Sequence, residues 1–147
     1  MDTTQINREL VISSDVSEVN IVLLEDKQLV ELHKERKNNN ISVGDVYMGR
    51  IKKILPGLNS AFVDIGCRKD AFLHYLDLGP QIKSLKKYTK FAEEGNNAQL
   101  NMDIFTLEKD IEKSGKISDF LSVGDRIPVQ IAKEPINTKG PRITSDI

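Results

Sequence analysis

Short runs of alternating apolar and polar residues dominate the chain and predict β-strands rather than long helices. In the first forty residues, three runs are rich in aliphatic and β-branched side chains: 9–13, 19–24 and 28–33. The last two flank a tight acidic turn, which predicts an N-terminal β-hairpin within residues 1–40. The polar run at 37–40 is turn-prone and marks the expected end of this unit.

From residue 41 onward, short apolar runs are separated by turns that contain glycine or proline. We expect five of these runs to be strands: 46–55, 60–65, 71–76, 126–132 and 142–145. Pro56-Gly57 ends the first run, and a five-residue hairpin loop at 66–70 follows the second. Five short strands in this order predict a mainly β protein with a small closed or partly open barrel.

Residues 79–116 interrupt this pattern between the third and fourth barrel strands. Two parts of the segment are predicted to be helical, 82–88 and 103–113. In the second part, apolar residues recur at helical spacing before a glycine: Ile104, Leu107, Ile111 and Gly115. A segment of this length is expected to be a partly helical insertion with structure of its own.

The second predicted barrel strand alternates between a small apolar set and a mixed set. The first set is Ala61, Val63 and Ile65, and the second is Ser60, Phe62 and Asp64. If the apolar set faces the core, Phe62 lies outside between two polar neighbours. The opposite orientation stays open at this point, because phenylalanine is usually buried.

On the return strand, Phe72 and His74 face either the core or solvent, as Phe62 does. A five-residue loop pairs Ile65 with Ala71, Asp64 with Phe72, and Phe62 with His74. Phe62, Phe72 and His74 then share one face, in a chain with five Phe, three Tyr and no Trp. Exposed rings on a barrel sheet favour stacking with the bases of single-stranded RNA. For His74, an ordinary surface role or an internal hydrogen bond is the other interpretation.

The numbers of charged residues limit which kinds of binding partner this chain can have. The 21 Lys and Arg residues nearly balance the 22 Asp and Glu residues, and the net charge of −1 excludes a globally basic nucleic-acid binder. A local basic patch is compatible with this balance, and several basic residues could meet phosphates: Arg50, Lys52, Lys53, Arg68, Lys69, Lys133, Lys139 and Arg142. A plainly solvated set of cations is the other interpretation.

Few side chains in this sequence are arranged for catalysis or metal binding. Asp64 has no second carboxylate at useful spacing on its face, and the single cysteine, Cys67, has no evident base. We therefore expect no catalytic residue, metal site or cofactor in this chain. No apolar run approaches the roughly 20 residues of a membrane span, and the first residues lack a signal-peptide pattern, so a cytoplasmic protein is expected.

Four segments, taken in order and spacing, resemble the S1 RNA-binding domain: 43–51, 61–66, 71–74 and 123–129. The match extends over residues 41–147 apart from the insertion at 79–116. A narrower set of segments resembles the amino-terminal part of the ribonuclease E/G family: 47–51, 55–66, 133–135 and 137–144. In that family the hairpin at 1–40 belongs to a ribonuclease-H-like subdomain that later sequence completes.

The resemblance implies a five-stranded OB-fold barrel with Phe62 and Phe72 as an RNA-stacking pair. It implies that Lys139, on the Asn-Thr-Lys-Gly loop, contacts RNA, and it extends this role to Lys133. Together with the residues placed by pattern, the expected RNA-binding set is Phe62, Phe72, His74, Lys139, Lys133, Arg50 and Arg68. Some family members carry a tyrosine where this chain has Ile65, which the alternation places inward.

We expect this region to bind single-stranded RNA and to position it for an endoribonuclease active site elsewhere in a longer parent chain. The family's magnesium-binding carboxylate pair and paired-cysteine zinc linker are absent here, so the chain is interpreted as a non-catalytic fragment. Its expected partners are single-stranded RNA, the other domains of the parent, and a second copy that pairs with the open edge of the N-terminal hairpin. An OB-fold module that docks proteins is the alternative.

Overall fold

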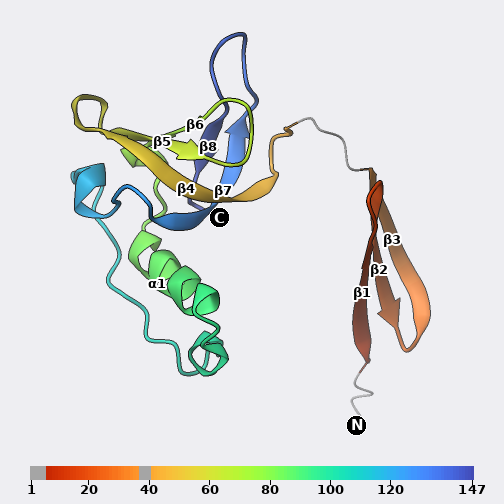
Figure 1. The fold of residues 1–147 in the computed structure, drawn as a ribbon. Helices are drawn as coiled ribbons and strands as arrows, with labels where there is room; N and C mark the ends of the chain where they lie inside the picture. The colour runs from red at the N-terminus through yellow and green to blue at the C-terminus, as the bar shows by residue number, and fades with distance from the viewer. Residues whose placement is uncertain (1–5, 37–40) are drawn as a thin grey trace. The chain divides into compact units, whose positions relative to one another are not determined.

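The computed structural model describes residues 6–36 and 41–147, and the chain divides into two units at residue 40 (Figure 1). The unit boundary expected at 37–40 lies outside the described residues, and so does the N-terminal stretch 1–5, where no signal peptide is expected. The two units are described one at a time.

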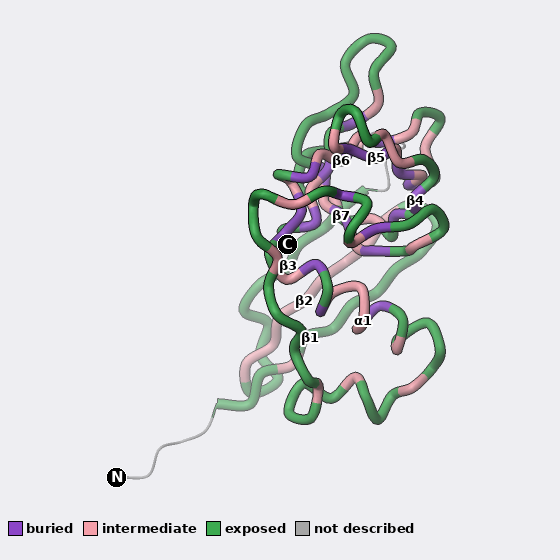
Figure 2. The backbone as a smooth tube through the Cα atoms, turned by 90° about the vertical axis from the view of Figure 1, so that its left-hand side faces the viewer, coloured by how far each residue is buried: buried purple, intermediate pink, exposed green. Residues whose placement is uncertain are grey.

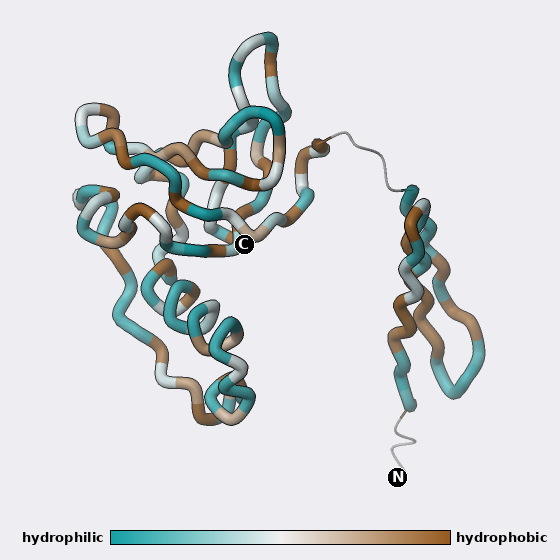
Figure 3. Tube along the Cα trace, viewed as in Figure 1, coloured by the Kyte–Doolittle hydropathy of each residue, from teal (hydrophilic) through white to brown (hydrophobic). Residues whose placement is uncertain are grey.

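The N-terminal unit is a three-stranded antiparallel sheet in the order β1 (Arg8–Ser14), β2 (Glu18–Glu25) and β3 (Gln28–Arg36). The predicted hairpin is confirmed as β2 and β3, joined through Asp26 and Lys27, whose φ angles of 49° and 65° suit a two-residue hairpin turn. Strand β1 pairs with the other edge of β2. Figure 3 shows hydrophobic stretches along these strands, yet no described side chain of this unit is fully buried.

The second unit contains a closed five-stranded barrel, which confirms the mainly β prediction and agrees with an OB-fold. Its strands are β4 (Val46–Leu55), β5 (Ser60–Asp64), β6 (Ala71–His74), β7 (Arg126–Lys133) and β8 (Arg142–Thr144). Their order around the barrel is β4-β5-β6-β8-β7, and β6 and β8 are parallel. The core contains inward-facing aliphatic residues from every strand, including Ile51, Val63, Leu73, Val129 and Ile143 (Figure 2). The segment between β6 and β7 adds further buried residues to it: Tyr75, Leu78, Ile82, Ile117 and Leu121.

Between β6 and β7 the chain forms the expected insertion. A short 3-10 turn, η2 (Tyr75–Asp77), leads to helix α1 (Ile82–Glu93), and two further turns follow, η3 (Asn97–Leu100) and η4 (Ile117–Asp119). The first predicted helix is confirmed and extends five residues beyond the predicted end at 88. No helix in residues 6–36 and 41–147 is long and apolar enough to span a bilayer.

The second predicted helix, at 103–113, is wrong: this segment contains no helix and runs back alongside α1 (Figure 1). Its backbone groups are bonded to the helix instead. Glu108 N donates to Ser84 Oγ at 2.8 Å, and Lys87 Nζ donates to the carbonyl of Thr106 at 2.9 Å. The helical spacing was misleading because Ile104 and Leu107 are 64% and 69% exposed and cover no core.

Tyr75 and Asn59 fasten the far end of the insertion to the barrel. The Tyr75 hydroxyl donates to the carbonyl of Glu112 and accepts from Gly115 N. Asn59 donates from Nδ2 to the carbonyl of Gly115 and accepts at Oδ1 from Ile117 N, at 3.1 and 2.7 Å. The insertion is therefore anchored where it returns to the barrel as well as where it leaves.

Candidate nucleic-acid interface

The β5–β6 hairpin places its two phenylalanines on the outer face of the barrel. Ala61 and Val63 are completely buried, and Phe62 between them is only partly buried. On the return strand, Leu73 is completely buried while Phe72 is partly exposed. The alternation argument is thus confirmed in its outward orientation. Ser60 is the exception, because it is buried and donates from Oγ to the carbonyl of Leu58 at 2.7 Å.

The predicted register of this hairpin is wrong by two residues. The structure pairs Phe62 with Phe72 and Ser60 with His74, not Phe62 with His74. The cause lies in the loop: the Asp64 carboxylate accepts a hydrogen bond from Gly66 N at 2.9 Å, and Gly66 has a φ of 80°. The turn therefore begins earlier than expected. A shift of two residues leaves every side chain on its predicted face, because the side-chain period of a strand is two.

The corrected register brings the two rings into direct contact. Phe62 and Phe72 lie edge to face, with centroids 6.2 Å apart and planes inclined by 67°. They form part of the wall of a groove of about 750 Å³ on the barrel surface. We call this the aromatic groove; its lining consists of Phe62, Arg68, Lys69, Asp70, Phe72, Lys133, Glu134, Ile136, Thr138, Lys139, Gly140 and Arg142.

Five of the seven residues expected to bind RNA line the aromatic groove together: Phe62, Phe72, Arg68, Lys133 and Lys139. They come from three places in the sequence, the β5–β6 hairpin, the end of β7 and the β7–β8 loop. Closure of the barrel places β8 between β6 and β7, so these distant segments become neighbours. Figure 1 shows the β7–β8 loop projecting above the barrel.

Arg50 and His74 do not line the aromatic groove. Arg50 lies on β4, with its guanidinium 3.9 Å from the Asp64 carboxylate. His74 accepts a hydrogen bond at Nδ1 from Leu76 N at 3.0 Å and so caps the turn η2. The internal hydrogen bond that the sequence left as the alternative for His74 is therefore present.

Sequence reasoning left several groove residues out of the expected set. Lys69 and Arg142 were among the basic residues considered, whereas Ile136 and Thr138 had no signal beyond their place in a loop near Lys139. Ile136 is apolar and 64% exposed at the groove. Its one signal in the sequence is its position directly before the Asn-Thr-Lys-Gly segment.

The charged residues of the lining are predominantly basic. Five lysine or arginine residues face two acidic residues, Asp70 and Glu134, and both acids have basic neighbours in the lining. Asp70 is paired with Lys52 Nζ at 2.9 Å, and Arg142 is paired with Asp77 at the same distance. The groove therefore joins an apolar aromatic surface to an excess of positive charge, which suits a polyanion with planar groups.

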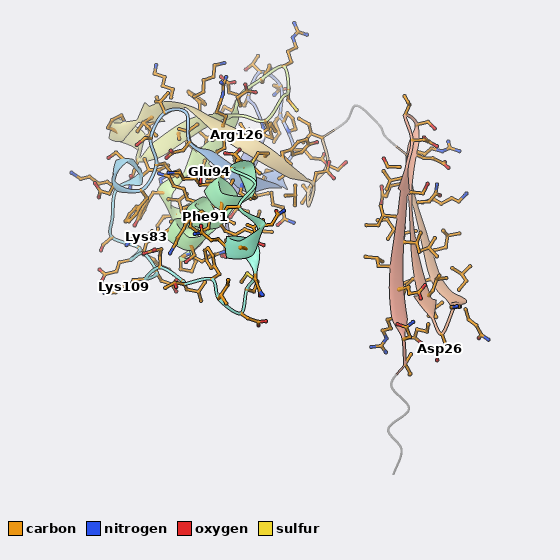
Figure 4. All side chains as sticks on the ribbon, turned by 60° about the horizontal axis from the view of Figure 1, so that its bottom comes forward. Asp26, Lys83, Phe91, Glu94, Lys109 and Arg126 are labelled. Atoms are coloured by element: carbon orange, nitrogen blue, oxygen red, sulfur yellow. The ribbon has the colours of Figure 1, made fainter. Side chains whose placement is uncertain are left out.

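A second hollow lies beside α1, where Lys83, Phe91 and Arg126 are labelled in Figure 4. Its basic residues are largely neutralised within the chain. Lys87 pairs with Glu108 and Arg126 pairs with Glu93, both at 2.9 Å. We therefore regard it as a weaker candidate for a polyanion than the aromatic groove.

Two groups outside the aromatic groove have shifted pKa values. Burial raises the pKa of Tyr47, and the nearby Asp45 carboxylate adds to the increase. A hydrogen bond from Lys87 lowers the pKa of Glu108. Within residues 6–36 and 41–147, no group of three His, Cys, Asp or Glu side chains could hold a metal ion.

Comparison with known proteins places this geometry in context. No family model matches the chain. Ribonuclease G of Haemophilus influenzae is 37% identical over 139 residues, which is 95% of this chain and 24% of that protein. Ribonuclease G of Escherichia coli is 34% identical over the same extent, and ribonuclease E of Synechocystis is 35% identical over 106 residues.

The chain spans about a quarter of the length of these ribonuclease G relatives. The similarity includes both units of the fold, because it extends over 95% of the chain. The segments that resembled the family in sequence also form the barrel and its aromatic groove. The chain accordingly belongs to the ribonuclease E/G family and corresponds to about a quarter of the length of its ribonuclease G relatives.

Proposed function

We propose that the barrel is an S1-type domain that binds single-stranded RNA in the aromatic groove. One observation carries the proposal: two adjacent phenylalanine rings lie on the outside of a closed barrel and line a groove with five basic side chains. The relationship to ribonucleases G and E supports an RNA-binding role in that family.

The physical argument rests on stacking and charge. Phe62 and Phe72 would stack on unpaired bases, and each stacked base contributes on the order of 1–3 kcal/mol. Arg68, Lys133 and Lys139 would contact phosphates and release counterions. Single strands fit this groove better than a duplex does, because only unpaired bases can present their faces to the rings.

In the parent protein, this region would position RNA while another region cleaves it. A magnesium ion, if the parent enzyme uses one, would be held by carboxylates outside the described residues, since no such cluster lies within them. The remaining domains of the parent are then its expected protein partners, and the cytoplasm is its expected location.

The test is a titration of the 147-residue chain into a fluorescent single-stranded oligoribonucleotide. A double variant, Phe62→Ala with Phe72→Ala, is expected to lose at least about tenfold in affinity, because two stacking surfaces are removed. Phe91→Ala, which removes a ring from α1 beside the other hollow (Figure 4), is the matched control and should bind normally. Normal binding by a folded double variant would contradict the stacking role.

Salt dependence separates RNA binding from the alternative of protein docking. Phosphate contacts make the logarithm of the RNA affinity fall linearly with the logarithm of salt concentration. Apolar docking through Phe62, Phe72 and the exposed Ile136 would not weaken in this way. A salt-insensitive complex with a protein partner, and no RNA complex, would favour the protein-docking module.

A further inference from the structure

The β7–β8 loop, residues 134–141, is held closely against the β5–β6 loop. A Cβ atom added to Gly140 would lie 1.9 Å from the carbonyl oxygen of Asp70, so the two backbones are nearly in contact. Lys69 Nζ donates a hydrogen bond to the carbonyl of Asn137 at 2.9 Å. We call these two contacts the loop clasp.

Both sides of the loop clasp are themselves anchored. Asp70 is paired with Lys52 of β4, which holds the β5–β6 loop to the barrel. Directly after Gly140, the carbonyl of Pro141 accepts a hydrogen bond from Phe72 N at 2.8 Å. The strand that carries one ring of the aromatic groove is therefore bonded to the end of the β7–β8 loop.

Lys139 lies between the two contacts of the loop clasp. Its backbone N donates to the carbonyl of Ile136 at 3.0 Å, which closes a tight turn through Asn137, whose φ is 53°. Asn137 is fixed by Lys69 on one side of this lysine, and Gly140 is fixed against Asp70 on the other. The backbone position of Lys139 at the aromatic groove thus depends on both contacts.

We propose that Gly140 and Lys69 are positioning residues for RNA binding, which hold Lys139 at the aromatic groove through the loop clasp. The inference rests on the proposed function, because it assigns these residues a role in the same site. A loop that is already ordered loses less conformational entropy when it binds, so the loop clasp increases affinity through the order that it gives to the loop.

Gly140→Ala is the first test. The added methyl group meets backbone rather than a movable side chain, so the two loops must separate. RNA affinity is expected to fall about fivefold or more. Gly57→Ala is the matched control, because a Cβ there meets no atom within 4 Å, and it should bind RNA normally. Unchanged affinity in Gly140→Ala would overturn the inference.

A double-mutant cycle tests whether the effect passes through Lys139. Gly140→Ala and Lys69→Met should each weaken binding in the unchanged chain and have little further effect when combined with Lys139→Met. Lys69→Arg, which retains a donor for the Asn137 carbonyl, should restore most of the affinity. Full additivity of Lys69→Met with Lys139→Met would mean that Lys69 contacts RNA directly, and would overturn its positioning role.

A measurement without RNA separates this inference from the proposed function. The backbone 15N heteronuclear NOE of Thr138 and Lys139 should fall in Gly140→Ala and stay unchanged in Gly57→Ala. If the unchanged chain bound no RNA, the proposed function would be wrong, and the RNA role of the loop clasp would be wrong with it. If RNA bound but the NOE and the affinity of Gly140→Ala were unchanged, only the loop clasp would be wrong.

Discussion

At the scale of single residues, Glu108 gives the insertion a measurable dependence on pH. Its carboxylate accepts a hydrogen bond from Lys87 Nζ at 2.9 Å, and this bond is the main cause that lowers its pKa below the ordinary value of 4.5. The charge of Lys87 acts in the same direction, and burial opposes both. The folded chain therefore binds this proton less tightly than the unfolded chain does.

Glu108→Gln is accordingly expected to lower the urea midpoint slightly at about pH 7 and to have less effect in acid. The stability contributed by a carboxylate with a lowered pKa is present above its unfolded pKa and is lost as the pH falls through its folded pKa. Urea titrations of both proteins across this range are the measurement, with Glu112→Gln on the same segment as the control. An equal difference between the proteins at every pH would contradict this account.

Residue alternation was the most reliable guide that the sequence offered. It separated Val63 and Phe62 onto opposite faces of the strand but left open which face is buried. The structure buries Val63, because a closed barrel buries one face of each strand. Alternation could not predict where the turn begins. The hydrogen bond from Gly66 N to the Asp64 carboxylate competes with the backbone hydrogen bonds between the two strands, and strand alternation does not reveal such a bond. It also could not show that Ile136 lies at the groove, since this requires the packing of two loops.

At the scale of elements, the insertion depends on Asn59 for its return to the barrel. This residue has a φ of 47° and forms two hydrogen bonds from its side chain to residues 115–117. Glycine would keep the backbone conformation and remove both bonds, whereas alanine would also strain the backbone. The two variants thus separate the contribution of the bonds from that of the conformation.

We expect Asn59→Gly to lower the free energy of unfolding by about 1–3 kcal/mol, because two partly buried backbone groups lose their partner. Asn59→Ala should lower it further. Urea denaturation of the three proteins measures both steps, and limited proteolysis should cut residues 101–116 faster in either variant. A glycine variant as stable as the unchanged chain would show that these bonds contribute nothing to stability.

The prediction of a helix at 103–113 was wrong because of contacts between elements. Apolar residues at helical spacing indicate a helix only if other parts of the protein cover the apolar face. Here Ile104 and Leu107 are exposed, so no such face is covered. The backbone of the segment is satisfied by side chains of α1, such as Ser84 and Lys87, and these partners are more than fifteen residues away in sequence. Patterns within the segment could not reveal such partners, whereas α1 itself has a continuous pattern and was found.

At the scale of the whole molecule, the two units differ in how much of their apolar surface is covered. The buried hydrophobic core of the described chain lies entirely within residues 41–147. In the N-terminal unit, Leu10, Ile12 and Leu29 are each more than 60% exposed, and β1 and β3 are its outer strands. Open edges and exposed apolar side chains favour pairing with another strand.

We therefore expect the 147-residue chain to self-associate as its concentration rises, while a shortened chain of residues 41–147 stays monomeric. The shortened chain is expected to fold because it keeps the whole described core. Light scattering over a concentration series measures the mean mass of each protein. Similar behaviour of the two proteins would show that the N-terminal sheet does not mediate association.

The double anchorage of the insertion has a consequence for how this region can vary. Tyr75 and Asn59 bind the chain where it re-enters the barrel, and neither of them lines the aromatic groove. Helix α1 adds Ile82 to the buried core, whereas residues 94–104 add no side chain to it. The loop 94–104 can thus be shortened, lengthened or exchanged for another module while the ring pair stays in place. The barrel offers a grafting point for protein engineers, at which a reporter domain could be carried beside an intact ligand groove.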